Sequence, residues 1–209
     1  MHYLPLTIRE ALPTDVFTDA EVIGLLKGTP DRRHGLMKRA LAKQDIIRLR
    51  RGVYSLGKGF QRQPPNPLAI APRIYSPSYV STESALSYHG WIPEAVYTVT
   101  SVCLKRSVTF NTPVGRFSYT RLPKFNFAGV ERVSTGPSVF LIANPTKALA
   151  DYILCRKTDL SPEQLRESLR VDGDVWRGIS TELLEDLVES YPCKRLKAFL
   201  KALRKGGAR

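Results

Sequence analysis

Cationic side chains between residues 32 and 51 are the first candidates for chemistry in this sequence. Arginine and lysine presented side by side can bind the phosphates of a nucleic acid and, where they reach a groove, the edges of its bases. Before Gln44 they recur at helical spacing, and after it they alternate with Ile47 and Leu49 as in a strand. The sequence therefore predicts a DNA-binding set, which is Arg32, Arg33, Lys38, Arg39, Lys43, Arg48, Arg50 and Arg51.

Further candidate functional residues lie later in the chain: His89, Lys147 and Asp151. Lys147 and Asp151 lie four residues apart in a predicted helix, where they form an ordinary surface ion pair or mark a functional face. We favour the surface pair. His89 ends a short predicted helix and has no cysteine, histidine or carboxylate at metal-ligand spacing nearby. We therefore favour a helix-end hydrogen bond for His89 over a catalytic or ligand role.

Common enzyme signatures are absent from the sequence. It contains no phosphate-binding G-x-x-x-x-G-K-[ST] loop, no G-x-G-x-x-G, no G-x-S-x-G, no H-E-x-x-H and no nuclease-type E-x-K. We therefore expect neither an enzyme nor a bound cofactor or metal. An activity in the second half that modifies a partner through dispersed residues stays as an alternative.

Composition narrows the range of partners and compartments. The 209 residues carry 32 Lys and Arg against 19 Asp and Glu, a formal charge of +13, which favours anionic partners. Three cysteines lie far apart without a C-x-x-C pair, so we expect a reducing cytoplasm and no disulfide framework. No apolar run approaches the roughly 20 residues that cross a bilayer, and no export signal opens the chain. We expect a cytoplasmic protein without a membrane partner.

The cationic set is expected to sit on a helix followed by a hairpin. Thr29 can cap a helix and Pro30 suits its first turn. Arg51 and Gly52 then turn the chain between strands 46–50 and 53–56. Arg33 falls on the apolar side of this helix, so its contact with DNA is the least secure of the set.

Two helices precede that helix, and together the elements predict a winged helix-turn-helix. The first covers residues 4–11, and the second runs from residue 19 to about residue 27 behind a Thr18–Glu21 capping box. The order of three helices and a hairpin matches a recognition helix followed by a wing. In such a module the helix reads bases and the wing adds contacts to phosphate.

A Gly- and Pro-rich segment after the hairpin predicts a domain boundary. We place a winged-helix domain at residues 1–63 and an α+β domain at residues 64–209. The first part holds 12 Lys and Arg against 6 Asp and Glu, so it is the more densely cationic. The second shows strand patterns between residues 96 and 142, which predict a small antiparallel sheet. Several helices accompany it. The last, residues 192–205, has a docked apolar side and a basic back that is either solvated or binds DNA or an acidic protein surface.

Three segments in this order resemble the AbiEi family of antitoxins, from type IV toxin–antitoxin systems linked to abortive infection of phage. They are residues 47–54, residues 84–90 (SALSYHG) and residues 144–151 (NPTKALAD). The resemblance implies that the N-terminal domain binds operator repeats upstream of its own operon and represses it. It also implies that the second domain neutralises a nucleotidyltransferase-like toxin, with or without touching it. A plain transcription regulator, whose second domain senses a ligand or oligomerises, is the alternative.

Overall fold

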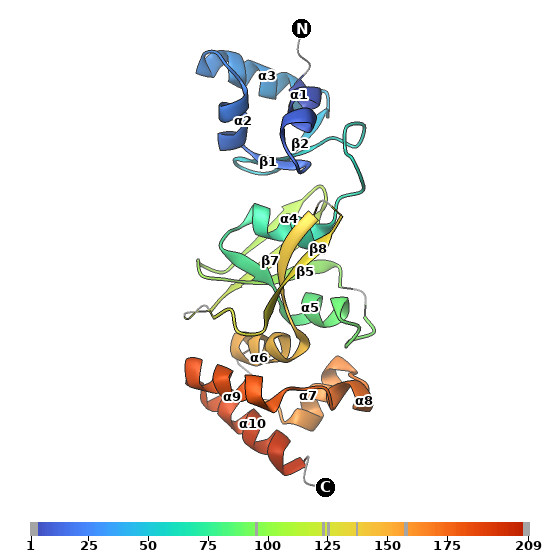
Figure 1. Ribbon diagram of the computed structural model, residues 1–209, viewed down its shortest axis with the longest axis vertical. Coiled ribbons are helices and arrows are strands. Elements are labelled where there is room, and N and C mark those ends of the chain that lie inside the picture. The colour runs from blue at the N-terminus through green and yellow to red at the C-terminus, as the bar shows by residue number, and fades with distance from the viewer. Residues whose placement is uncertain are drawn as a thin grey trace.

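A computed structural model describes residues 4–206, except residues 95, 123, 125, 137, 157 and 158. The molecule is elongated, and its two termini lie at opposite ends of the long axis (Figure 1). Helices and sheets both contribute, as expected for an α+β protein. Among the described residues, no helix has the length and apolar character needed to cross a membrane.

The N-terminal part follows the predicted order of elements closely. Its helices and strands are α1 (Leu4–Ala11), β1 (Val16–Thr18), α2 (Asp19–Leu25), α3 (Pro30–Ala42), β2 (Ile46–Arg50) and β3 (Val53–Leu56). The Thr18–Glu21 capping box is present at α2, and the side chain of Thr29 caps α3, as predicted. The sequence did not reveal β1, which pairs with β3 and completes an antiparallel sheet of order β1-β3-β2.

A six-stranded sheet forms the middle of the molecule. Its strands are β4 (Ser78–Val80), β5 (Thr98–Cys103), β6 (Val108–Thr112), β7 (Gly115–Arg121), β8 (Val130–Thr135) and β9 (Ser138–Ala143), in the order β6-β7-β5-β4-β9-β8. The predicted antiparallel sheet is found only in part. The pairs β4–β5, β6–β7 and β8–β9 are antiparallel, but β5 runs parallel to β7 and β4 runs parallel to β9, so the sheet is mixed. Two strands joined by a crossover can pair in parallel, and alternation within each strand does not reveal that direction.

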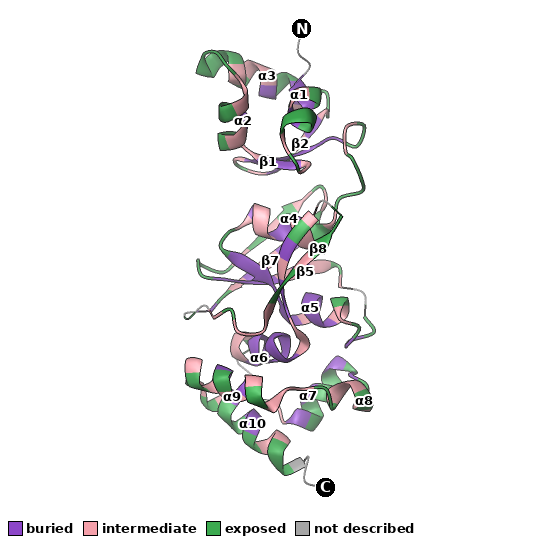
Figure 2. Ribbon diagram, viewed as in Figure 1, coloured by how far each residue is buried: buried purple, intermediate pink, exposed green. Residues whose placement is uncertain are grey.

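Helices cover both faces of this sheet. They are α4 (Pro67–Ile74), α5 (Thr82–Tyr88), α6 (Pro145–Cys155), α7 (Pro162–Leu169), α8 (Gly173–Trp176), α9 (Thr181–Ser190) and α10 (Lys194–Gly206). Of these, α4 lies on the side of the N-terminal part, while α5 and α6 lie on the other side, with α7 to α10 beyond them (Figure 1). The central strand β4 is consequently buried on both faces, as are most residues of α6 (Figure 2).

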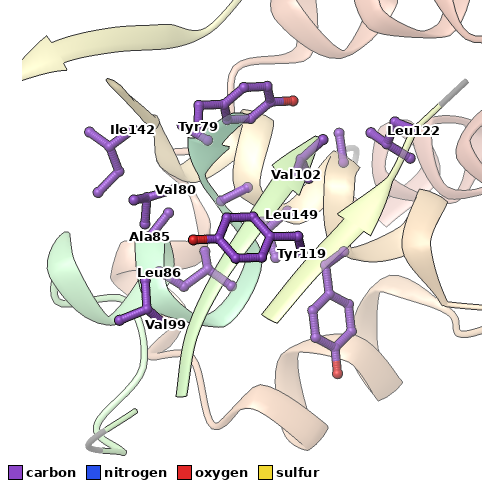
Figure 3. Close-up of a cluster of buried hydrophobic side chains, with 14 of the residues drawn as sticks. Tyr79, Val80, Ala85, Leu86, Val99, Val102, Tyr119, Leu122, Ile142 and Leu149 are labelled. Carbon is purple, nitrogen blue, oxygen red and sulfur yellow. The ribbon is translucent and has the colours of Figure 1, made fainter. Parts of the chain in front are cut away.

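Apolar side chains from both faces of the sheet form the larger core. Val80, Leu86, Val99 and Ile142 contribute to it from β4, α5, β5 and β9 (Figure 3). A smaller cluster around Phe17 holds α1, α2 and α3 on the three-stranded sheet. Burial of this kind stabilises by about 25 cal/mol per Å² of apolar surface, so each cluster can fix the helices that carry functional side chains.

The Gly- and Pro-rich segment at the predicted domain boundary is tied to the N-terminal part. The backbone N–H of Arg62 donates to Asp15 at 2.8 Å, and its guanidinium donates to the carbonyl of Leu12 at 2.8 Å. Val16, Leu49 and Val53 also belong to the larger core rather than to the N-terminal cluster. The boundary at residue 63 stays a prediction, and the two sides of it are packed together.

Candidate nucleic-acid interface

Six of the eight predicted DNA-binding side chains lie exposed on the N-terminal part. They are Arg32, Lys38, Arg39, Lys43, Arg48 and Arg51. Met37 and Ala40 are buried on the opposite side of α3, so packing of that side directs the cations outward. None of the six charged groups makes an ion pair or hydrogen bond with another described residue. Their charges are therefore available to an external anion.

A groove between α2, α3 and the β2–β3 hairpin brings part of this set together. Lys38 lines it from α3, and Arg48 and Arg51 line it from the hairpin. Arg32 and Arg39 of α3, and Lys43 at its C-terminal cap, are exposed but do not line the groove. The arrangement places a helix and a turn beside one shared concave surface, which can contact a duplex from two directions.

Two side chains at the groove shape its polar character. The carboxylate of Asp19 lies in the groove, and its neighbour Tyr54 is buried, as expected for a packing residue. Burial raises the pKa of the Tyr54 phenol, and the charge of Asp19 raises it further. The phenol thus stays protonated at neutral pH and can hold the Asp19 carboxylate in place.

Arg33 and Arg50 differ from the rest of the predicted set because protein groups bind their guanidinium groups. Arg33 is half-buried and donates to the carbonyl of Gly28, which precedes α3. Arg50 donates through Nε to the carbonyl of Ile74 in α4, and its guanidinium lies 6.0 Å from the ring centroid of Phe110. Strand alternation alone gave no sign that β2 faces a neighbour on this side. We therefore leave Arg50 out of the DNA-contacting set.

A second link joins the same two parts of the molecule. Arg73 of α4 binds both carboxylate oxygens of Glu21 at 2.7 Å and the carbonyl of Val16 at 3.1 Å. Although partial burial raises the pKa of Glu21, hydrogen bonds from Arg73 and Thr18 outweigh it and leave the pKa below its usual value. The sequence predicted the capping role of Glu21 but not this long-range pair. Together with Arg50, it fixes how α2 and the hairpin sit on α4.

Lys147 and Asp151 form a buried cluster instead of the predicted surface pair. Both side chains are fully buried, and Lys147 Nζ lies 2.7 Å from Asp151 Oδ1. The hydroxyl groups of Tyr79 and Ser81 donate to Asp151 Oδ2 at 2.8 and 2.7 Å. Every residue from Thr146 to Ile153 is buried, so α6 has no solvent face on which a surface pair could lie.

Aromatic rings enclose the ammonium group of Lys147. Its Nζ lies 4.9 Å from the ring centroid of Tyr191 and 5.6 Å from that of Tyr79. Burial raises the pKa of Tyr191 to about 12, with Asp151 adding to the shift, and raises the pKa of Tyr79 further. Sequence patterns missed Tyr79, Ser81 and Tyr191 because they come from separate elements. The enclosed cluster ties β4, α6 and the end of α9 together and has no exposed reactive group.

His89 occupies a structural position at the end of α5. Its Nε2 lies 3.1 Å from the carbonyl oxygen of Ala143, with which it hydrogen-bonds, and its ring meets Tyr88 edge to face. This agrees with the predicted helix-end hydrogen bond, and it links α5 to the end of β9. In the described part of the chain, no group of three His, Cys, Asp or Glu residues is placed to hold a metal ion.

No protein-family model matches the chain, and no curated protein matches it either.

Proposed function

We propose that this chain is a DNA-binding antitoxin whose N-terminal part, a winged helix-turn-helix, represses its own operon. The observation that carries the DNA-binding half is the set of six exposed, unpaired cations on α3, at its C-terminal cap and on the hairpin. The order α1-β1-α2-α3-β2-β3 supports it, because α3 then corresponds to a recognition helix and β2–β3 to a wing. Arg32 and Arg39 contact the major groove, while Lys38, Arg48 and Arg51, which line one groove together, contact phosphate.

The antitoxin half of the proposal rests on the resemblance to the AbiEi family. The residues that carry this resemblance also have structural roles in the fold. Residues 84–90 include part of α5 and His89, and residues 144–151 hold the Asn144 cap and the buried ion pair. We infer that residues 64–209 neutralise a nucleotidyltransferase-like toxin. The N-terminal part binds operator repeats upstream of the operon.

Two substitutions separate the DNA contact assigned to Arg39 from the structural role assigned to Arg50. Arg39→Ala is expected to weaken binding to the upstream DNA by about 1–3 kcal/mol if the contact is to a base, and by less if it is to phosphate. It should leave thermal stability unchanged because Arg39 is exposed. Arg50→Ala should instead lower the free energy of unfolding by about 1–2 kcal/mol, since a charged hydrogen bond to Ile74 is lost.

Fluorescence anisotropy on the upstream DNA and thermal unfolding measure these two effects. Arg132→Ala, an exposed arginine on β8, is the matched control for both and should change neither. Unchanged DNA affinity in Arg39→Ala would remove this side of α3 from the interface. A stable Arg50→Ala protein with weakened DNA binding would return Arg50 to the DNA-contacting set.

Rescue of cells tests the antitoxin half. The full chain and the variant Lys38→Glu/Arg48→Glu/Arg51→Glu are expressed from an inducible promoter beside the nucleotidyltransferase-like gene adjacent to this reading frame. Both should restore growth, because neutralisation is assigned to residues 64–209. Failure of both refutes the antitoxin assignment, and the absence of such a gene favours a plain transcription regulator. Rescue by the wild type alone would contradict the separation of roles.

A further inference from the structure

A row of four lysines runs along the outer side of the last helix, α10. Lys194, Lys197, Lys201 and Lys205 are spaced by three and four residues, so they share one side of the helix. We call this row the lysine ridge. At 1.5 Å per residue it extends about 16 Å. All four side chains are exposed, which is the arrangement of a continuous cationic edge.

Packing of the opposite side of α10 turns the ridge toward solvent. Leu196, Phe199 and Leu200 are buried in the main core, where they hold the helix against α6, α7 and α9. In contrast to Arg204, which pairs with Glu185 of α9, the ridge ammonium groups make no ion pair or hydrogen bond with another described residue. The ridge is thus a fixed row of charges that the fold itself leaves unpaired.

Charges on either side of the ridge define where a partner fits. Toward α6 and α7, Lys194 borders a groove with an apolar floor, where Arg156 and Arg195 also lie. These two arginines form ion pairs with Glu83 and Asp159, so the unpaired charge on this side belongs to the ridge. On the α9 side, three exposed acidic residues are spaced by four and three positions, so they share one side of that helix. They are Glu182, Asp186 and Glu189. A polyanion is therefore attracted to the ridge itself and is repelled from α9.

We propose that the lysine ridge is a second nucleic-acid contact, which binds the phosphate backbone of a duplex. A duplex offers one negative charge per about 1.7 Å of its axis, so any stretch of it presents phosphates along the whole 16 Å row. An acidic protein surface would need a comparably long run of carboxylates without intervening cations. Lysine side chains suit this contact because a phosphate backbone requires point charges and no base-specific geometry.

The position of the ridge has a consequence for assembly. The ridge lies at the C-terminal end of the elongated molecule, while α3 lies at the N-terminal end (Figure 1). The two cationic faces are therefore separate contacts, and one molecule can hold two duplex segments. Binding by the ridge is independent of the proposed function, whereas bridging of two duplexes rests on it.

The test uses the full chain and a random 30-bp duplex DNA at about 50 mM salt, followed by fluorescence anisotropy. The N-terminal face is first disabled by Lys38→Glu/Arg48→Glu/Arg51→Glu, and Lys197→Glu/Lys201→Glu are then added. We expect the first variant to keep residual binding and the added changes to weaken it at least about tenfold. The salt dependence of the residual binding should fall by about 1.8 in slope, at about 0.9 for each lost phosphate contact.

Arg116→Glu/Arg132→Glu, added to the same N-terminal variant, changes the net charge equally at exposed sites on β7 and β8. Equal loss of binding in this control would show that overall charge, and not the ridge, is responsible, which overturns the proposal. If adding Lys197→Glu/Lys201→Glu leaves the residual binding unchanged, the proposal is also overturned, and an acidic protein surface is left as the partner of the ridge. Thermal unfolding checks that each variant is folded, and Lys197→Gln/Lys201→Gln repeats the test without charge reversal.

The two proposals fail in distinguishable ways. If wild-type and N-terminal variants bind duplex equally and only the ridge changes reduce binding, the ridge proposal stands and the N-terminal assignment fails. Bridging is measured separately, where the N-terminal assignment holds, by the retention of a second labelled duplex on immobilised duplex. The wild type should retain it, and Lys197→Glu/Lys201→Glu should not. Retention by this ridge variant would contradict bridging through α10.

Discussion

Replacing Asp151 by asparagine is expected to lower the free energy of unfolding by about 3–5 kcal/mol, the usual cost of leaving one member of a buried ion pair uncompensated. Asparagine has nearly the same volume, so the change removes charge without opening a cavity. Lys147 would then keep an enclosed ammonium group between two aromatic rings without its counter-ion at 2.7 Å. Tyr79 and Ser81 would lose a charged acceptor for their hydroxyl groups.

Chemical denaturation measures this loss, and thermal unfolding should show a shift of about 6–20 °C for a chain of this size. Asp186→Asn, at an exposed carboxylate on α9, is the matched control and should stay within about 0.5 kcal/mol of the wild type. The double variant Lys147→Met/Asp151→Leu should recover part of the loss, since an apolar pair of similar volume needs no charge compensation. A change of under 1 kcal/mol in Asp151→Asn would contradict the buried pair.

Reversing three charges at the N-terminal groove is expected to weaken duplex binding at least about 100-fold. Lys38→Glu, Arg48→Glu and Arg51→Glu each remove a cation and place a carboxylate beside phosphate. Each lost contact reduces the binding free energy by about 1 kcal/mol or more, so the loss of three contacts weakens affinity more than about 100-fold. The groove is lined by all three side chains, so one duplex can meet them at the same time.

The folded state should tolerate these changes because the three side chains are exposed. A control with Arg106→Glu, Arg116→Glu and Arg132→Glu has the same net charge, at exposed sites away from the groove. Anisotropy with the upstream DNA should show a several-fold loss at most in the control, from the weaker overall field. Similar losses in both variants would assign binding to net charge rather than to the groove.

The N-terminal elements could be predicted from the sequence because their ends carry local signals. Thr18 and Thr29 cap helices, Pro30 begins one, and Gly52 adopts a positive φ of 78° in the hairpin turn. The strands β1, β4 and β8 were missed. The first two have three residues each, too few for alternation to be recognised, and in β8 the partly buried residues Val130 and Val133 are three apart, so the strand does not alternate. Strand direction in the large sheet depends on pairing between distant segments, which no local pattern contains.

Side-chain partners across the fold were the least predictable feature. A spacing of four residues is the same for a surface pair and for a buried one, so Lys147 and Asp151 gave no direct sign of their enclosure. The run of Ala148, Leu149, Ala150 and Ile153 around them was the available signal, since a helix apolar on all sides is buried. Arg50 offered none, because its partner Ile74 lies 24 residues away.

Salt dependence of DNA binding tests the central claim most directly. The affinity of the wild type for the upstream DNA is measured between about 50 and 200 mM salt, beside Lys38→Ala/Arg48→Ala/Arg51→Ala. If these cations contact phosphate, the slope of log affinity against log salt should be smaller in the variant by about 2.7, or 0.9 for each contact. Equal slopes, with equal affinities at low salt, would contradict a DNA interface on α3 and the hairpin.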